Sequence, residues 1–120
     1  MTTAILPDRK PGTRCCDREA KPLVRTREAQ RLADDMQVLA HPVRLQILDI
    51  LARNGGRVCV CDIDGAVAVK QPTVSHHLKL LRDAELIDSE RQGLWAYYFI
   101  KRDGLNALTS RIQTYLEAIR

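Results

Sequence analysis

Four cysteines form two close pairs in this sequence, Cys15 with Cys16 and Cys59 with Cys61, the second within "GGRVCVCDIDG". Thiolates bind soft or borderline ions, so two such pairs are candidate metal ligands. A disulfide, thiol redox chemistry and simple burial of small apolar side chains are the alternatives. Adjacent cysteines such as Cys15 and Cys16 make a poor disulfide with each other, because closing so small a ring strains the peptide. The chain has no C-x-x-C redox motif and no evident acid-base set, so we do not expect an enzyme.

The direction of the Cys59 and Cys61 side chains depends on where the local helix begins. In a complete α-helix they would point about 200° apart and could not share one ion. If Cys59 or Val60 is still extended, residues i and i+2 fall on one side. The positive end of the helix dipole would then lower the thiol pKa values and favour the thiolates. We therefore expect the pair at the start of a short helix.

Apolar periodicity predicts two helices before the second cysteine pair. The first begins near Thr26, and its apolar face carries Ala29, Leu32, Met36 and Leu39. His41-Pro42 breaks it, and His41 is expected to cap the next helix, in which Pro42 occupies the first turn. That helix, "PVRLQILDILAR", has a broad buried face of Val43, Ile47, Leu48, Ile50 and Leu51 and ends at Asn54-Gly55-Gly56.

The remaining elements are predicted to be two helices, a hairpin and a last helix. "CVCDIDGAVAV" is a short helix with Ile63, Ala66 and Val67 inward, and "QPTVSHHLKLLRDA" starts at Pro72 with Val74, Leu78 and Leu81 on its buried side. "IDSERQGLWAYYFIK" alternates as two strands with a turn at Gln92-Gly93, so that Trp95, Tyr97 and Phe99 face one way and Ala96, Tyr98 and Ile100 the other. Asp103 is expected to cap the final helix, whose stripe is Leu105, Leu108, Ile112, Tyr115 and Ile119. This order describes a mainly α, winged helix-turn-helix fold with one β-hairpin wing.

The second helix of the helix-turn-helix has the features of a DNA reader. Its outward N-terminal half carries short polar groups and a cation, which can reach base edges and phosphates in a major groove. The candidate contacts are Gln71, Thr73, Ser75, His76 and Lys79, with Arg91 and Gln92 at the hairpin tip. A solvated helix face is the alternative, but the hairpin and the net charge of +4 favour DNA. We expect His77 to be packed or hydrogen-bonded rather than a ligand.

Length and composition indicate one domain preceded by an arm. Residues 1–24 contain prolines and charges without apolar periodicity and are predicted to form a flexible arm carrying Cys15 and Cys16, whereas residues 25–120 form the DNA-binding and dimerisation domain. The first twenty residues lack the apolar run of a signal peptide, and no stretch is long and apolar enough to span a membrane. We therefore expect a cytoplasmic location, in which thiols stay reduced.

The motifs "LAHPVRLQILDIL", "VCVCDI", "QPTVSHHLKLLRDAELI" and "RQGLWAYYFI" resemble the ArsR/SmtB family of metal-responsive repressors over about residues 28–116. The resemblance implies a homodimer that binds operator double-stranded DNA and releases it when an inducer binds. It also implies a dimer interface built from the first and last helices, which agrees with the stripes at Leu32, Met36 and Leu39 and at Leu105, Leu108 and Ile112. The family's Asp and His zinc site on the last helix is absent, because that segment has no histidine.

The resemblance leaves two classes of inducer. Arsenic sensors often carry "CVCDLC", but the position of the third cysteine is Asp64 here, so a three-sulfur site needs the arm. Members that sense cadmium or lead pair arm cysteines with "CVCD", which favours Cd(II), Pb(II) or Zn(II). The adjacent "CC", "QPTVSHHLK" and "GLWAYY" look more like arsenic-responsive members. We therefore predict As(III), or Sb(III), bound by Cys15, Cys16, Cys59 and Cys61, with thiol redox sensing as a minor alternative.

Overall fold

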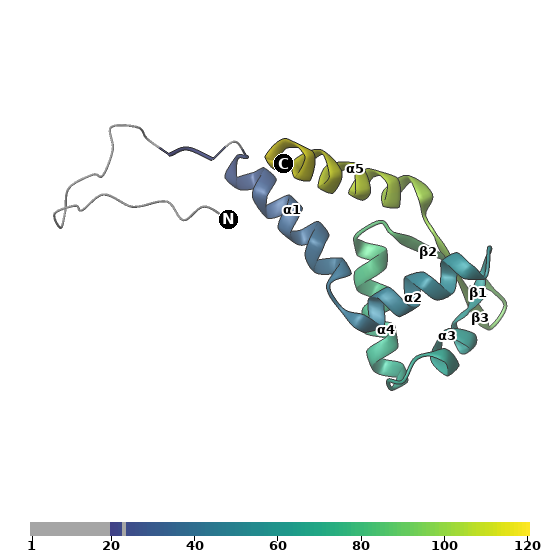
Figure 1. Ribbon diagram of the computed structural model, residues 1–120. Helices are drawn as coiled ribbons and strands as arrows, with labels where there is room; N and C mark the ends of the chain where they lie inside the picture. The colour runs from purple at the N-terminus through teal and green to yellow at the C-terminus, as the bar shows by residue number, and fades with distance from the viewer. Residues whose placement is uncertain (1–19, 23) are drawn as a thin grey trace.

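A computed structural model describes residues 20–22 and 24–120, so Cys15, Cys16 and most of the predicted arm lie outside the described residues. In chain order, the described part contains α1 (Thr26–Leu39), α2 (Pro42–Arg53), β1 (Val58–Cys59), α3 (Val60–Ala66), α4 (Gln71–Asp83), β2 (Ile87–Gln92), β3 (Trp95–Ile100) and α5 (Arg102–Ile119) (Figure 1). The predicted mainly α fold with a β-hairpin wing is confirmed. Within the described ranges, no helix is both long enough and apolar enough to cross a bilayer.

The helix starts follow the sequence signals in all but one case. α1 begins at Thr26, and the Glu28 side chain accepts a hydrogen bond from the Arg25 backbone N–H at 3.5 Å. Pro42 occupies the first turn of α2, and His41 caps it, because its Nδ1 accepts from the Val43 N–H at 3.1 Å. The prediction that Asp103 caps α5 is wrong. Lys101 is the residue before α5, and Asp103 lies inside the first turn, where its charge faces the positive end of the helix.

The sheet contains a strand that the sequence did not reveal. Its order is β1-β3-β2, with both pairs antiparallel. Cys59 is extended directly before α3, as predicted, but it is also the second residue of β1 and pairs with Tyr97. The β2–β3 loop is Gly93-Leu94 rather than Gln92-Gly93, since Gln92 pairs with Trp95. Gly93 takes a φ of 62°, a conformation that favours glycine at the first position of such a two-residue turn.

The core lies where α2, α3 and α4 meet the sheet. Ile47, Ile63, Val74 and Leu81 have no exposed surface. Other core members from these elements and the connections that flank them are Val43, Leu51, Val58, Val67, Leu78, Leu86 and Ile87. Tyr98 and Ile100, which the strand alternation placed on the same side of β3, both pack against this core. Ala66 was expected to face inward but is exposed, because α3 ends there and Val67 turns into the core in an extended conformation.

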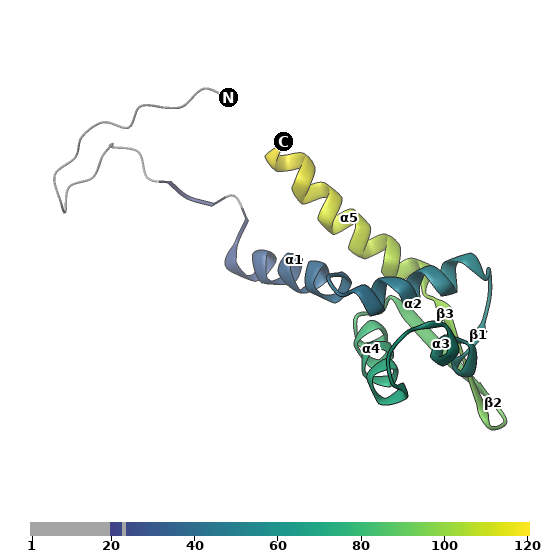
Figure 2. The same ribbon diagram turned by 60° about the horizontal axis from the view of Figure 1, so that its bottom comes forward.

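α1 and α5 extend together away from this core, and α4 and the hairpin lie at the other end of the molecule (Figures 1 and 2). An ion pair joins the two long helices: Arg111 Nε and Nη2 donate to the two Asp35 carboxylate oxygens at 2.8 and 3.0 Å. Leu108 is buried, and Leu105 and Ile112 pack against the core of the same protomer. These three residues, predicted to face a partner subunit, therefore contribute to the packing of their own protomer.

Candidate nucleic-acid interface and thiol site

One side of α4 is buried in the core, and the opposite side is exposed to solvent. Val74, Leu78 and Leu81 are buried, whereas the five predicted contacts on this helix are all exposed: Gln71, Thr73, Ser75, His76 and Lys79. Lys70 precedes α4, and Pro72 lies in its first turn. The positive end of the helix dipole therefore lies beside the short hydroxyl side chains, an arrangement suited to phosphate and base edges.

Two features of this face were not evident from the sequence. Lys79 Nζ donates to Asp83 Oδ2 at 2.9 Å, so part of its charge is neutralised within the helix. His77, next to His76, is 5% exposed, and its Nδ1 lies 3.0 Å from Arg44 Nη1. This confirms that His77 is a packed, hydrogen-bonded histidine. Arg44 carried no periodicity or motif signal of its own, so its contact with α4 could not be found from the sequence.

The hairpin tip carries the other two predicted contacts. Arg91 and Gln92 are exposed at the end of β2, and Leu94 in the turn is 90% exposed. Behind the tip, Arg57 pairs with Glu90 at 2.6 Å and lies over the Phe99 ring. The tip therefore presents a cation, an amide and an apolar side chain, which suits the backbone and floor of a groove.

The structure brings Cys59 and Cys61 together. Cys59 is extended, with φ −63° and ψ 140°, and α3 begins at Val60, so residues i and i+2 share a side as expected. Their Sγ atoms lie 2.7 Å apart. Cys59 is buried and Cys61 is exposed. Two thiolates on a tetrahedral ion with metal–sulfur bonds of about 2.3 Å would lie ~3.8 Å apart, so a small outward rotation of Cys61 suffices.

The expectation of lowered thiol pKa values is wrong for Cys61. Its pKa is raised above the ordinary value of 9.0, first because its side chain hydrogen-bonds to Cys59, and then through partial desolvation and the neighbouring Cys59 and Asp62 charges. The backbone N–H of Asp62 acts in the opposite direction and is the weaker influence. A neighbouring thiol therefore outweighs the helix terminus, and Cys61 must lose its proton to become a ligand.

A third donor is not in place within residues 20–22 and 24–120, where no group of three His, Cys, Asp or Glu side chains is arranged to hold a metal ion. Asp64, at the position of the expected third cysteine, has a buried Oδ1 without a hydrogen-bond partner. Cys15 and Cys16, the other two predicted ligands, lie outside the described residues. The described part thus supplies a close pair of sulfurs that needs further donors to complete a site.

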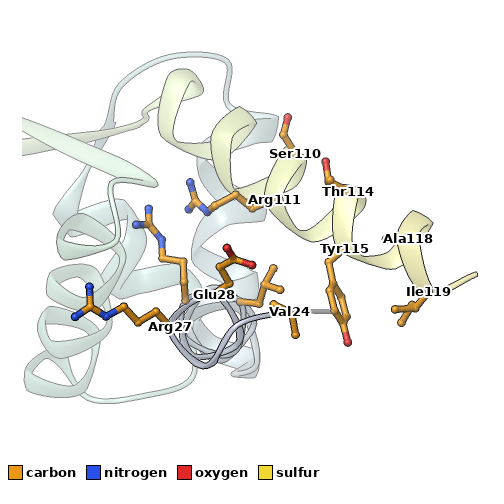
Figure 3. A pocket seen from close by; sticks show the side chains of 11 residues that line it. Val24, Arg27, Glu28, Ser110, Arg111, Thr114, Tyr115, Ala118 and Ile119 are labelled. Atoms are coloured by element: carbon orange, nitrogen blue, oxygen red, sulfur yellow. The ribbon is translucent and has the colours of Figure 1, made fainter. Parts of the chain in front are cut away.

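An apolar groove of about 700 Å³ separates the far ends of α1 and α5. Figure 3 shows Tyr115 directed from α5 toward Val24 at the start of α1, with Ile119 beyond it. Leu32, Arg27 and Arg31 of α1 also line the groove. Leu116 and Ile119 remain 49% and 58% exposed. Apolar surface of this kind at the end of two long helices is typical of a protein interface.

The sequence comparisons agree on one family. The family model described as "Bacterial regulatory protein, arsR family" matches residues 41–89. An uncharacterized HTH-type transcriptional regulator of Methanocaldococcus jannaschii is 38% identical over 74 residues, which cover 62% of this chain and 82% of that protein. The arsenical resistance operon repressor of Bacillus subtilis is 40% identical over 74 residues, covering 62% of this chain and 70% of the relative.

Solved structures support the fold. The crystal structure of an ArsR family transcriptional regulator matches with a TM-score of 0.63 and 23% identity, covering 75% of this chain and 91% of that chain. The solution structure of a homodimeric winged helix-turn-helix DNA-binding domain from Mycobacterium bovis matches with a TM-score of 0.59 and 27% identity, covering 83% and 91%. With the exposed polar face of α4 beside a β-hairpin wing, these relationships show that the chain belongs to the ArsR family and is a DNA-binding transcriptional repressor rather than an enzyme.

Proposed function

We propose that this repressor is a homodimer that binds operator DNA and releases it when trivalent arsenic binds to its cysteines. α4 would enter the major groove with Gln71, Thr73, Ser75, His76 and Lys79 as its contacts, while Arg91 and Gln92 approach the backbone or minor groove. Cys59 and Cys61 would form the fixed half of the inducer site. Cys15 and Cys16, on the arm formed by residues 1–24, would form the mobile half.

The observation that carries the proposal is the pair of sulfur atoms 2.7 Å apart at the start of α3. Trivalent arsenic and antimony prefer a pyramidal set of three sulfurs, and soft thiolates favour these elements. Two sulfurs on one side of the chain supply most of that set, and a third from the arm would complete it. Relatives named arsenical resistance operon repressors, such as that of Bacillus subtilis, support the choice of inducer.

The location of the thiol pair suggests how inducer binding reaches the DNA. Cys59 belongs to the sheet that forms the wing. α3, which starts next to it, precedes α4 and buries Ile63 in the same core. Drawing the arm onto Cys59 and Cys61 would therefore strain both the wing and the reading helix. Coupling of about 1–3 kcal/mol, or 5–150-fold in affinity, is typical of such linked sites, and useful derepression requires the upper part of that range.

The second copy is expected to dock on α1 and α5. The groove between them is apolar and includes the exposed Ile119, and Met36 of α1 and Leu116 of α5 are also partly exposed. A twofold dimer uses the same surface on both subunits, so each copy would cover the groove of the other. Two α4 helices related by this axis would read half-sites about one helical turn apart. The homodimeric Mycobacterium bovis domain supports this assembly.

Operator release tests the proposal directly. A labelled duplex selected by the purified chain from a random-sequence pool is titrated in parallel with arsenite, antimonite, Cd(II), Pb(II), Zn(II) and an oxidant. Arsenite and antimonite should release the duplex at the lowest concentrations. The double variant Cys15→Ser, Cys16→Ser should bind the duplex normally and fail to release it. Normal arsenite-driven release by that variant would disprove the four-cysteine site, and release by oxidant alone, reversed by reductant, would assign redox sensing instead.

A Cd(II), Pb(II) or Zn(II) sensor of the same fold is the second candidate. Asp64 favours it, because an aspartate stands where a self-contained three-sulfur site would have its third cysteine. A four-thiolate set that includes the arm cysteines would suit these divalent ions. Competition between Cd(II) and arsenite for release of the duplex separates the two candidates, since the inducer should act at the lower concentration. Sulfur-to-metal charge-transfer absorption on addition of Cd(II) provides an independent measure of thiolate ligation.

A further inference from the structure

Arg44 joins three elements that have different roles. Its Nε donates to the Val38 carbonyl at 2.6 Å and its Nη2 to the Gln37 carbonyl at 3.0 Å, both in the last turn of α1. Its Nη1 contacts Nδ1 of His77 on α4 at 3.0 Å. Arg44 itself lies on α2. One guanidinium therefore holds the end of the helix proposed to dimerise against the helix proposed to read DNA.

The end of α1 depends on this contact. Its last turn carries no basic residue of its own, and the carbonyls at a helix C-terminus need donors from elsewhere. The Arg44 side chain supplies two of them, and its positive charge lies at the negative end of the helix dipole. Moving α1 relative to α2 would therefore displace the same group that holds His77.

The chemistry of the contact fixes the protonation of His77. Arginine has only donors and stays protonated, so Nδ1 of His77 must accept and the ring proton must reside on Nε2. A doubly protonated His77 has no acceptor and cannot make this bond. The His77 ring is almost fully buried. Three titratable side chains face it: His41 at the start of α2, with 4.2 Å between ring centroids, His76 on α4, with 5.7 Å between ring centroids, and Arg44 on α2.

We propose that the Arg44–His77 hydrogen bond is a joint that positions α4 relative to α1 for operator binding, and that protonation of His77 opens it. This inference rests on the proposed placement of α4 on the operator. Burial of the ring, followed by the positive charges of His41, Arg44 and His76, lowers the pKa of His77 below 6.5. The joint is therefore closed at neutral pH and opens on acidification below the ordinary histidine range. His77 acts as a positioning residue, since it is buried and does not face the DNA.

The experiment measures affinity for the selected duplex between pH 7.5 and 5.0, with the full chain at constant salt. Because the His77 pKa is lowered, wild-type affinity should stay level near neutral pH and fall by about fivefold toward the acidic end, the lower end of coupling between linked sites. His77→Asn should bind as wild type at pH 7.5 and lose the fall, because the Asn oxygen replaces Nδ1 as an acceptor but does not titrate. The comparison is repeated in a His76→Asn background, which removes the exposed histidine proposed to contact DNA. The fall should persist in that background and disappear when His77→Asn is added, because only His77 contacts Arg44.

A role confined to stability gives a different result: His77→Asn would shift the melting temperature but keep the same pH profile of affinity. That result, or a wild-type profile without a fall, would overturn the proposal. Lys79→Ala tests the placement of α4 separately, since it should weaken binding at every pH and leave the shape of the profile intact. Nitrogen NMR of the wild-type histidine rings needs no variant to fold. It should find the Nε2–H tautomer for His77, and an Nδ1–H tautomer would also overturn the proposal.

Discussion

Cys59 faces Tyr97 across β1 and β3, and Tyr97 faces Glu90 across β3 and β2. The backbone of the buried thiol is thereby linked to the outer strand of the wing through two antiparallel pairs. Glu90 in turn pairs with Arg57, one residue before β1. A displacement of Cys59 on inducer binding would thus act on a closed ring of contacts around the wing, rather than on an isolated loop.

The raised pKa of Cys61 gives a prediction that separates the two inducer classes. A divalent cation replaces the thiol protons, so its binding releases protons and strengthens as pH rises toward the raised thiol pKa. Arsenous acid, As(OH)₃, exchanges each hydroxide for a thiolate, and the thiol proton leaves with that hydroxide as water. No net proton is released. Between pH 6.5 and 8.5, Cd(II) affinity should therefore rise by up to about tenfold per pH unit for each proton released, and arsenite affinity should stay nearly constant.

Calorimetry in two buffers of different ionisation enthalpy measures the proton count for each ion. A Cys61→Ser variant should abolish the pH dependence contributed by that thiol. If arsenite binding releases protons in the same number as Cd(II) binding, the assignment of neutral arsenous acid as the bound species is wrong.

Gly104 is predicted to be irreplaceable for a steric reason. A Cβ at this position of α5 would lie 1.7 Å from the backbone carbonyl oxygen of Glu85. Glu85 already has a φ of 65°, so its backbone has little freedom to retreat. Gly104→Ala should therefore lower the free energy of unfolding by about 3 kcal/mol. Gly65→Ala is the control, because nothing lies within 4 Å of its added Cβ, and it should be neutral or stabilising by up to about 1 kcal/mol. Urea unfolding measures the free energy of unfolding of both variants. Equal free energies for Gly104→Ala and Gly65→Ala would contradict the close packing of α5 on Glu85.

The helices were predictable because their signals are local. Pro42 and Pro72 fall in first turns, and apolar steps of three and four residues fix which side of α2 and α4 is buried. β1 was not predictable, because two residues carry no periodicity and their partners in β3 are far along the chain. Periodicity likewise placed Leu108 on the packed side of the last helix. It could not show whether that side packs against a partner subunit or against the protomer's own core.

The same limit applied to the candidate site. The exposed face of α4 and the shared side of the two thiols follow from helix geometry and were predicted. The pKa of Cys61 was not, because it depends on the distance between its sulfur and that of Cys59. The contact between Arg44 and His77 joins residues of two helices whose packing angle no local pattern specifies.

The Asp35–Arg111 pair should fix the angle between α1 and α5. The Asp35 side chain is 9% exposed and that of Arg111 is 32% exposed, so removing the carboxylate charge leaves a partly desolvated guanidinium with a weaker partner. Asp35→Asn should lower the free energy of unfolding by about 2 kcal/mol, less than a fully buried pair would require. It should also weaken dimerisation, measured by sedimentation equilibrium. Asp49→Asn breaks the exposed pair with Arg53 and should change stability by less than about 0.5 kcal/mol, with no effect on dimerisation.

Lys79 tests whether α4 lies against phosphate. Its ammonium pairs with Asp83 when DNA is absent, so Asp83→Asn should free the charge and raise affinity for any duplex. Lys79→Ala should weaken binding to all sequences alike and reduce the slope of log affinity against log salt by about 1. Arg120→Ala is the control: it removes an exposed cation, paired with Glu117, just after α5 and should leave the slope unchanged. If Lys79→Ala also leaves the slope unchanged while Thr73→Ala alters sequence selection, α4 reads bases without a phosphate contact at Lys79, and the affinity must come from the wing.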